Sequence, residues 1–440
     1  MDNINKQFYN YLWAYVLVAL SGCLGNVVDG IIVGNLISAD GVSAISLSKP
    51  VNQFIFTLHL LINAGAGMLV GYALGQKNIN DARRFFSISL SLSVGLGVLL
   101  ALFCGVFFLD ETTRLLCNNE QILPLARDYM QVLLLGNPAF ILMWGLSTMV
   151  GVDGQPRLVS LAVIIDNALN LFLDIVFIQW LDWGITGSSA ATVVGHLVGI
   201  AILLSHWWKP EHRRLKYIGI SCESGGIIAR IVSQGAPLAV ASISLTLLLL
   251  SANRIVLSTL GQTGIFAFAV CMNLLQVYNL FLSGTCQTLQ SLGAIQVGKH
   301  DAEGLNVVLR KAFRFITIAM AITCLFVWID PQAIAALFGA NNPDYIVETD
   351  NALRIFAISF IPFCYIYTLM VVYKLYGYHK MALFISLALS LTVIPVLWGV
   401  AHTVPNYLWY SYLIAYIIEA LLIVLFHRIG HVKFELKAKE

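Results

Sequence analysis

The chain has 440 residues, of which 59% are hydrophobic and only 11% are charged. A soluble domain typically carries about 25% charged residues, so a compact soluble fold of this length could not bury so much apolar surface. The composition therefore indicates an integral membrane protein. The net charge of +2 gives no indication of a nucleic-acid partner, and the eight cysteines show no metal-ligand spacing.

Apolar stretches that are long enough to cross a bilayer recur along the whole chain. Each span needs about 20 apolar residues, and backbone polar groups in lipid must be satisfied within a helix. We therefore predict an all-α membrane protein with twelve transmembrane helices. They lie near residues 10–36, 44–74, 86–109, 123–150, 158–181, 184–208, 228–260, 264–297, 309–330, 349–374, 381–402 and 406–427.

The distribution of lysine and arginine predicts the orientation, because cytoplasmic segments of membrane proteins carry an excess of both residues. The two termini and the loops that follow even-numbered spans hold 20 of the 25 basic residues. The other five are Lys49, Arg114, Arg127, Arg254 and Arg354. This bias predicts that the N- and C-termini are both cytoplasmic, which agrees with an even number of spans.

An internal repeat appears when each position is compared with the position 223 residues later. GQKNINDARR, which begins at Gly75, aligns with GKHDAEGLNV, which begins at Gly298, and VDGQPR aligns with LYGYHK. A shared offset near half the chain length indicates two duplicated halves. Because six spans make up each half, the repeats are parallel and related by a pseudo-two-fold axis along the membrane normal. Secondary transporters with alternating access are built in this way, and we predict lobes over residues 1–215 and 216–440.

Four acidic residues lie well inside the predicted spans, where a charged carboxylate costs on the order of 3 kcal/mol. Two of them, Asp166 and Asp174, flank Asn170 at four-residue spacing in the fifth span and share one helical face with it. Such an oxygen-rich face suits a proton or a hard cation such as Na⁺. Alternatively, Asp166 lies near the cytoplasmic end of the span and is simply hydrated. The other two carboxylates are Asp29, which lies between glycines in the first span, and Glu419.

Three further features of the spans are polar. Thr192, on the sixth span, could add a hydroxyl to this face, or it could bond the carbonyl of its own helix four residues earlier. Arg254 and Glu419 are the exceptional charges of the second half, and we expect them to form a pair.

Two polar stripes on the repeat-equivalent second and eighth spans either join helices or line a cavity. We predict cavity lining, by Asn52, His59, Asn63, Gln276, Asn279 and Gln287.

The spans contain no HExxH or GxSxG motif and no clustered His/Asp metal pattern. His59 and His196 stand alone in their spans. We therefore expect that the protein is not an enzyme and that it has no cofactor other than a coupling ion.

Over almost its whole length the chain resembles the multidrug and toxic compound extrusion (MATE) family. The resemblance is carried by NVVDGIIVGNL, GYALGQKNINDARR, VGVDGQPRLVSLAVIIDNALNLFLDIVFI and GITGSSAATVVG. It implies a two-lobed antiporter that exports amphipathic, often cationic organic compounds in exchange for Na⁺ or H⁺. The cation site that it implies, for Na⁺ or a proton, consists of Asp29, Asn170, Asp174 and Thr192.

The resemblance also implies a multi-pass protein of the bacterial plasma (inner) membrane. Its partners would be small organic substrates, membrane lipid and the coupling ion, with no nucleic acid and no obligate protein partner. Some family members carry acidic residues on spans seven and ten. Here span seven offers Arg254 and span ten has no carboxylate in its apolar interior, which argues against a second acidic site on those spans. A lipid-linked oligosaccharide or lipid flippase of the same superfamily is the alternative function.

Overall fold

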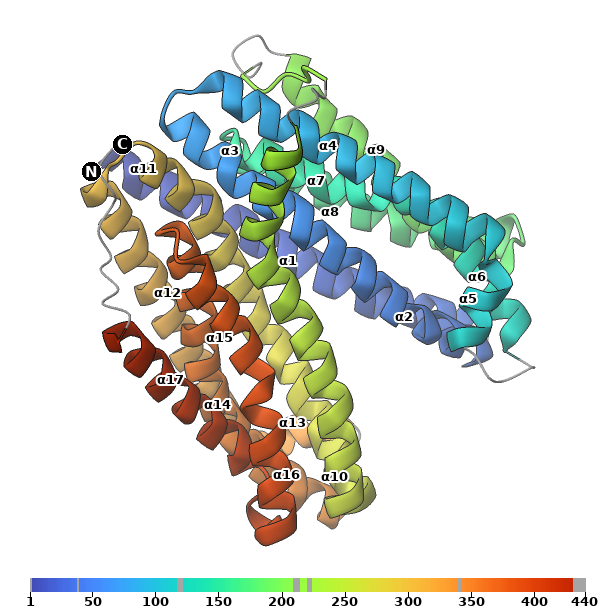
Figure 1. The fold of residues 1–440 in the computed structure, drawn as a ribbon. Coiled ribbons are helices and arrows are strands. Elements are labelled where there is room, and N and C mark those ends of the chain that lie inside the picture. The colour runs from blue at the N-terminus through green and yellow to red at the C-terminus, as the bar shows by residue number, and fades with distance from the viewer. Residues whose placement is uncertain are drawn as a thin grey trace. The chain divides into compact units, whose positions relative to one another are not determined.

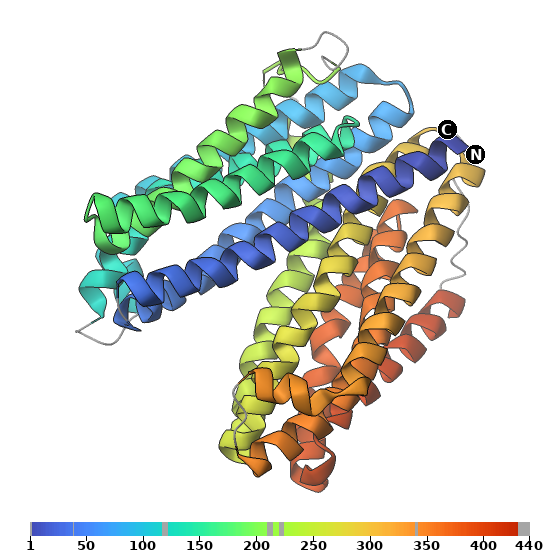
Figure 2. The same ribbon diagram turned by 180° about the vertical axis from the view of Figure 1, so that it is seen from behind.

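The computed structural model describes residues 2–37, 39–116, 122–208, 214–219, 224–338 and 342–429. Within these ranges every regular element is a helix (Figures 1 and 2). The predicted fold class is therefore confirmed.

The chain forms two compact units, which we name the N-terminal unit and the C-terminal unit. The N-terminal unit comprises Lys6–Ala236 and Gln290–Lys299, and the C-terminal unit comprises Met1–Asn5, Pro237–Leu289 and His300–Glu440. The two units are defined by contacts between residues, whereas the two lobes predicted above are defined by the internal sequence repeat. The division into lobes after residue 215 therefore stays a prediction.

The helices of the first half run from the N-terminus to the end of the sixth predicted span. They are α1 (Asp2–Leu36), α2 (Ala39–His59), η1 (Leu60–Ala64), α3 (Gly65–Gly75), α4 (Ile79–Leu102), η2 (Phe103–Phe107), α5 (Leu109–Leu116), α6 (Leu123–Leu135), α7 (Asn137–Val152), α8 (Pro156–Ile175), η3 (Val176–Trp180), α9 (Gly184–Leu204) and η4 (Ser205–Trp208).

The second half begins with α10, which is divided by a kink at Gly261. Its helices are α10 (Ser224–Thr288), η6 (Leu289–Gly293), α11 (Ala294–Gly298), α12 (Ala302–Ile329), α13 (Pro331–Leu337), α14 (Pro343–Leu375), α15 (His379–Leu391), α16 (Val393–Thr403), η7 (Pro405–Tyr407) and α17 (Tyr410–Ile429).

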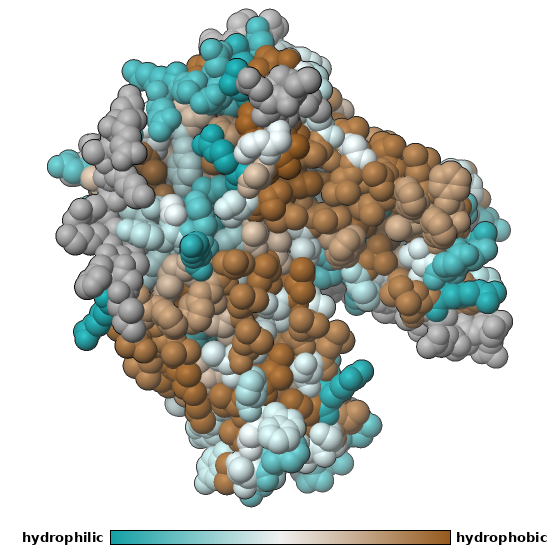
Figure 3. All heavy atoms as spheres, in the orientation of Figure 1, coloured by the Kyte–Doolittle hydropathy of each residue, from teal (hydrophilic) through white to brown (hydrophobic). Residues whose placement is uncertain are grey.

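The described helices account for all twelve predicted spans. Ten stretches are long and apolar enough to cross a membrane, and the pair Leu123–Leu135 and Asn137–Val152, bent by 48°, makes an eleventh. The stretch Gly225–Gly298 supplies two spans, because Gly261 has non-helical angles (φ 65°, ψ −148°) that divide it. In Figure 3 hydrophobic residues cover the sides of the helices and hydrophilic residues gather near their ends, as expected of helices that face lipid.

The internal repeat is also present in the geometry of the turns. Lys77 and His300, which the repeat places in equivalent positions, both have positive φ, 58° and 55°. The next residues, Asn78 and Asp301, both cap the following helix, because each side-chain oxygen accepts a hydrogen bond from the backbone N–H three residues later. The two halves therefore start their third and ninth spans with the same local structure.

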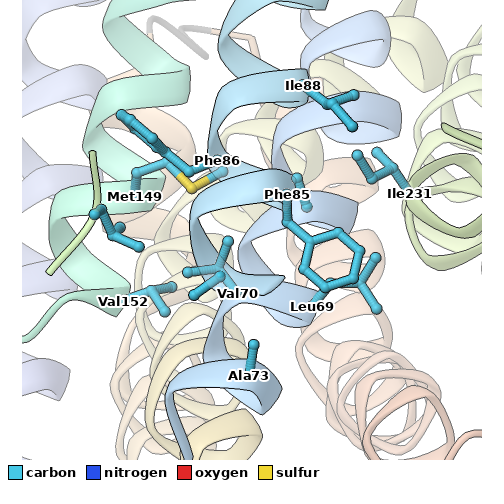
Figure 4. Packing of buried hydrophobic residues seen from close by; sticks show 12 residues of the cluster. Leu69, Val70, Ala73, Phe85, Phe86, Ile88, Met149, Val152 and Ile231 are labelled. Carbon is cyan, nitrogen blue, oxygen red and sulfur yellow. The ribbon is translucent and has the colours of Figure 1, made fainter. Parts of the chain in front are cut away.

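A cluster of buried apolar side chains holds together the part of the N-terminal unit that lies around α3, α4 and α7. Side chains of α4 pack between α3 and α7, and α10 contributes one residue (Figure 4). The labelled members are Leu69, Val70, Ala73, Phe85, Phe86, Ile88, Met149, Val152 and Ile231. This packing fixes α7 within the unit, and α7 in turn packs against α8 and α9, which carry the candidate site.

Candidate functional site

Helices α8 and α9 pack closely along their length, because glycines of α9 face α8. A Cβ atom built on Gly195 would lie 2.6 Å from Oδ1 of Asp166 and 2.9 Å from its backbone oxygen. No side chain fits at that distance, so the absence of a Cβ at this position lets the two helices approach. Polar side chains of α8 consequently reach α9 directly.

The polar residues of α8 and α9 form successive hydrogen-bonded rungs, which we name the α8–α9 ladder. In the first rung, Nδ1 of His196 lies 2.9 Å from both carboxylate oxygens of Asp166. In the second, Nδ2 of Asn170 donates to Oγ1 of Thr192 over 3.1 Å. The rungs move four residues forward on α8 and four residues back on α9, so the helices are antiparallel and one face of each contributes to the ladder.

The same spacing places Ser188 opposite Asp174, one turn further along both helices. Asp174 is fully buried and Ser188 is 1% exposed. Oγ of Ser188 has no hydrogen-bond partner among the described residues. A buried hydroxyl without a hydrogen-bond partner among the described residues therefore lies at the level of Asp174.

Thr192 makes both of the interactions that the sequence left open. Its hydroxyl accepts the hydrogen bond from Asn170 and donates to the backbone oxygen of Ser188, four residues earlier in α9, over 3.1 Å. The hydroxyl is thus held in one orientation, in contact with the amide of α8.

Helix α1 lies beside α8. Nδ2 of Asn167 donates to Oγ of Ser21 over 2.9 Å, and a Cβ atom on Gly25 would lie 3.2 Å from Oδ1 of Asn167. Asp29 follows Gly25 by one helical turn in α1, but its side chain lies outside the described residues. The role predicted for Asp29 in cation binding therefore stays a prediction, as do those of Asn170, Asp174, Thr192 and Asp166.

The polar stripe of the second span is packed against neighbouring helices. Nδ2 of Asn63 lies 3.3 Å from Nδ1 of His59, and Oγ of Ser93 on α4 donates to Oδ1 of Asn63 over 2.9 Å. The ring of His59 lies 5.3 Å from that of Trp144 on α7. Asn52 is half-buried, and its Oδ1 atom has no hydrogen-bond partner among the described residues.

The matching stripe on α10 is more open. Gln276 is exposed, whereas Asn279 and Gln287 are half-buried. The cavity-lining role that the sequence predicts for the two stripes stays a prediction. The expected pair between Arg254 and Glu419 is wrong, because Arg254 is exposed while Glu419 is fully buried and its oxygens have no hydrogen-bond partner in the described chain.

The chemistry of the α8–α9 ladder suits a proton or a monovalent hard cation. Among the described side chains no group of three or more His, Cys, Asp or Glu residues has an arrangement that could hold a metal ion. The ladder combines carboxylate, amide and hydroxyl oxygens, the ligand types that hard cations prefer. It could therefore take a proton on a carboxylate or a cation among these oxygens.

Sequence reasoning overlooked His196 and Ser188. His196 follows Thr192 by four residues and Ser188 precedes it by four, so both share the helical face on which Thr192 was placed. That spacing is the signal that the sequence offers. It does not identify the partner of His196, because Asp166 lies on the neighbouring helix α8.

Comparison with known proteins agrees with this architecture. The MatE family model matches residues 16–176 and 237–398, once in each repeat, and together these matches cover more than half of the chain. The multidrug export protein MepA of Staphylococcus aureus is 24% identical over 298 residues, which make up 67% of this chain and 66% of that protein. MepA of Staphylococcus haemolyticus is 21% identical over 356 residues, 80% of this chain and 77% of that protein.

Solved structures share the fold at low sequence identity. A MOP superfamily transporter from Pyrococcus furiosus, described as having a binding pocket of reverse polarity, has a TM-score of 0.86 at 19% identity and is matched over 97% of this chain and 96% of its own. A MATE structure in the bent conformation has a TM-score of 0.87 at 19% identity, over 97% and 95%. The family model, the curated relatives and the fold agree, and the chain belongs to the MATE family of membrane transporters.

Proposed function

We propose that this protein is a secondary active antiporter that exports amphipathic, cationic organic compounds in exchange for Na⁺ or H⁺ by alternating access. The excess of Lys and Arg in one set of loops supports cytoplasmic termini. Its similarity to bacterial multidrug export proteins supports export of drug-like compounds across the plasma membrane of a bacterium. Membrane lipid and the coupling ion would be its other partners, with no cofactor, nucleic acid or obligate protein partner.

The observation that carries this proposal is the complete burial of Asp174, near the C-terminal end of α8. A charged carboxylate inside a membrane protein is costly unless a proton or a cation neutralises it. Binding the coupling ion would neutralise Asp174, and releasing the ion would leave a charge that this environment disfavours. Because the two states differ in charge, a conformational change that alters the surroundings of Asp174 would be coupled to the ion.

Asn170 and Thr192 would act as neutral ligands beside this carboxylate. The bond between them holds an amide and a hydroxyl oxygen in fixed positions, one turn from Asp174. Preorganised oxygen ligands lower the cost of removing water from a cation. With H⁺ as the ion, the same groups would hydrogen-bond the protonated carboxyl group.

No specific observation favours the flippase alternative. The curated relatives are multidrug export proteins. Arg254, the basic residue singled out above in the seventh span, is exposed. The titratable members of the candidate site are Asp166, Asp174 and His196.

Transport of a fluorescent cationic dye in proteoliposomes tests the proposal. The wild type is compared with Asp174→Asn while H⁺ and Na⁺ gradients are imposed separately. Asp182→Asn is the matched control, because Asp182 is exposed in the turn before α9 and its positive φ of 56° is tolerated by asparagine. We expect gradient-driven dye transport in the wild type and in the control, and its loss in Asp174→Asn. Equal transport in all three proteins would refute coupling at Asp174.

A further inference from the structure

The C-terminal unit contains a fully buried carboxylate, Glu419, in the middle of its last span. Glu419 is nine residues from either end of the span Tyr410–Arg428, or about 14 Å at 1.5 Å per residue. It lies on the inward face of α17 together with Tyr412 and Tyr416, which are each 2% exposed. Its carboxyl group therefore faces the interior of the unit at mid-span rather than lipid.

Among the described residues, Glu419 has neither a hydrogen-bond partner nor an ion-pair partner. Its exposed fraction is 0%, and neither carboxylate oxygen has a hydrogen-bond partner among the described residues. The hydroxyl of Tyr412, on the same face of α17, also has no hydrogen-bond partner among the described residues. Most buried polar groups in proteins are hydrogen-bonded, so two such groups on one buried face are unusual and point to a ligand.

Among the described residues, the titratable groups near this face include phenols and thiols. Tyr416 lies near Glu419 and near Cys364 of α14, and Tyr412 lies near Cys271 of α10. Helices α15 and α16 also pack against α17, but their titratable residues, His379, Lys380 and His402, lie at the helix ends. The charged residues near the start of α14 are either exposed or paired, as in the pair of Arg354 with Asp350. Lys374, at the other end of α14, lies near Cys286.

A carboxylate in these surroundings would be an isolated buried charge. Moving such a charge out of water costs several kcal/mol or more unless it is paired. Among the described residues Glu419 belongs to no group of three or more His, Cys, Asp or Glu side chains that could hold a metal ion, so a proton is the ligand that a lone carboxyl group can take. Protonation gives the neutral acid, which the surrounding phenol rings and apolar side chains accept.

We propose that Glu419 is a second proton-binding site, separate from the α8–α9 ladder, which binds and releases a proton during the transport cycle. In the described conformation the carboxyl group carries the proton, and release transfers it to water that reaches the C-terminal unit in another conformation. A residue with only a packing role at mid-span would avoid the desolvation penalty by being apolar. This inference rests on the proposed ion-coupled export, to which it adds a second proton.

Infrared difference spectroscopy of the purified protein, titrated with acid and base, tests the proton site directly. The C=O stretch of a protonated carboxyl group is compared in the wild type, Glu419→Gln and Glu419→Asp. The matched control is Glu303→Gln, because Glu303 is exposed at the start of α12. We expect a titrating band that is lost in Glu419→Gln, moved in Glu419→Asp and unchanged in the control. The same band in wild type and Glu419→Gln would overturn the inference.

Proton counting in proteoliposomes tests whether the site takes part in transport. We expect Glu419→Gln to lower the number of protons exchanged per dye molecule, and an unchanged number would overturn the transport role. The infrared band must persist in Asp174→Asn. If Asp174→Asn leaves coupled transport intact but the Glu419 band is present, the proposed coupling at Asp174 fails and the proton site at Glu419 stands. If the wild type lacks the Glu419 band, only the inference about Glu419 fails.

Discussion

Gly75 and Gly298 are equivalent residues of the two repeats, and they contact each other. A Cβ atom on Gly75 would lie 2.3 Å from the backbone oxygen of Ile295, and one on Gly298 would lie 2.1 Å from that of Tyr72. The repeat also makes Tyr72 equivalent to Ile295. The crossing of α3 and α11 is therefore symmetric.

This crossing predicts that Gly298→Ala destabilises the protein. The added methyl group would overlap a backbone oxygen, which cannot rotate away, so α3 and α11 would have to separate at a cost of about 1–3 kcal/mol. Thermal unfolding in detergent measures the effect. Gly399→Ala is the control, because a Cβ at Gly399 meets nothing within 4 Å, and it should leave the midpoint unchanged or raise it. Equal midpoints for the two variants would contradict the close crossing.

The sequence was sufficient to predict the helices, the repeat and the polar face of α8. These features depend on local patterns: hydrophobic length, the Gly75 and Gly298 turns, and the four-residue spacing of Asp166, Asn170 and Asp174. The sequence could not pair α8 with α9, because hydrogen bonds between helices depend on their rotation and on a close approach at Gly195. The pairing of Arg254 with Glu419 failed for the same reason, since the helical faces on which they lie are set by packing.

The buried carboxylate of Asp153 connects the segment after α9 to the rest of the N-terminal unit. Asp153 is 2% exposed and lies 2.9 Å from Nε2 of His206 and 2.8 Å from a guanidinium nitrogen of Arg214. Arg214 also donates to the backbone oxygen of Asp153 over 2.5 Å, and its own backbone oxygen accepts from Nε of Arg83 over 2.8 Å. The carboxylate of Asp153 thus joins the end of α7 to η4 and to residues 214–219.

We predict that Asp153→Ala destabilises the protein by about 3 kcal/mol, because His206 and Arg214 lose a buried partner. Asp110→Ala is the matched control. Asp110 forms a short pair with Arg127, 2.6 Å, but both side chains are exposed, and exposed pairs contribute about 0–1 kcal/mol. Thermal unfolding compares the two variants. A larger loss of stability in Asp110→Ala than in Asp153→Ala would contradict the importance of burial.

The second rung of the ladder predicts the effect of changes at Thr192. Thr192→Val keeps the shape of the side chain but removes the hydroxyl that contacts Asn170, whereas Thr192→Ser keeps the hydroxyl. A hydrogen bond contributes about 1–1.5 kcal/mol, so we expect the apparent affinity for the driving ion to fall by about tenfold in Thr192→Val and to change little in Thr192→Ser. Dye transport measured against ion concentration gives this affinity. An unchanged affinity in Thr192→Val would show that the hydroxyl does not contribute to binding of the driving ion.

The first rung predicts a stability effect that does not depend on transport. His196→Ala would leave the Asp166 carboxylate buried without the imidazole, and hydrogen bonds to charged groups contribute about 1.5–3 kcal/mol. We expect a lower unfolding midpoint for His196→Ala than for His402→Ala, because His402 is exposed and bonds only the carbonyl of Trp398 in its own helix. A double-mutant cycle with Asp166→Asn then isolates the pair. A coupling energy of about 0.5 kcal/mol or more would identify a direct interaction, whereas additive effects would mean that Asp166 is hydrated and that the ladder begins at Asn170.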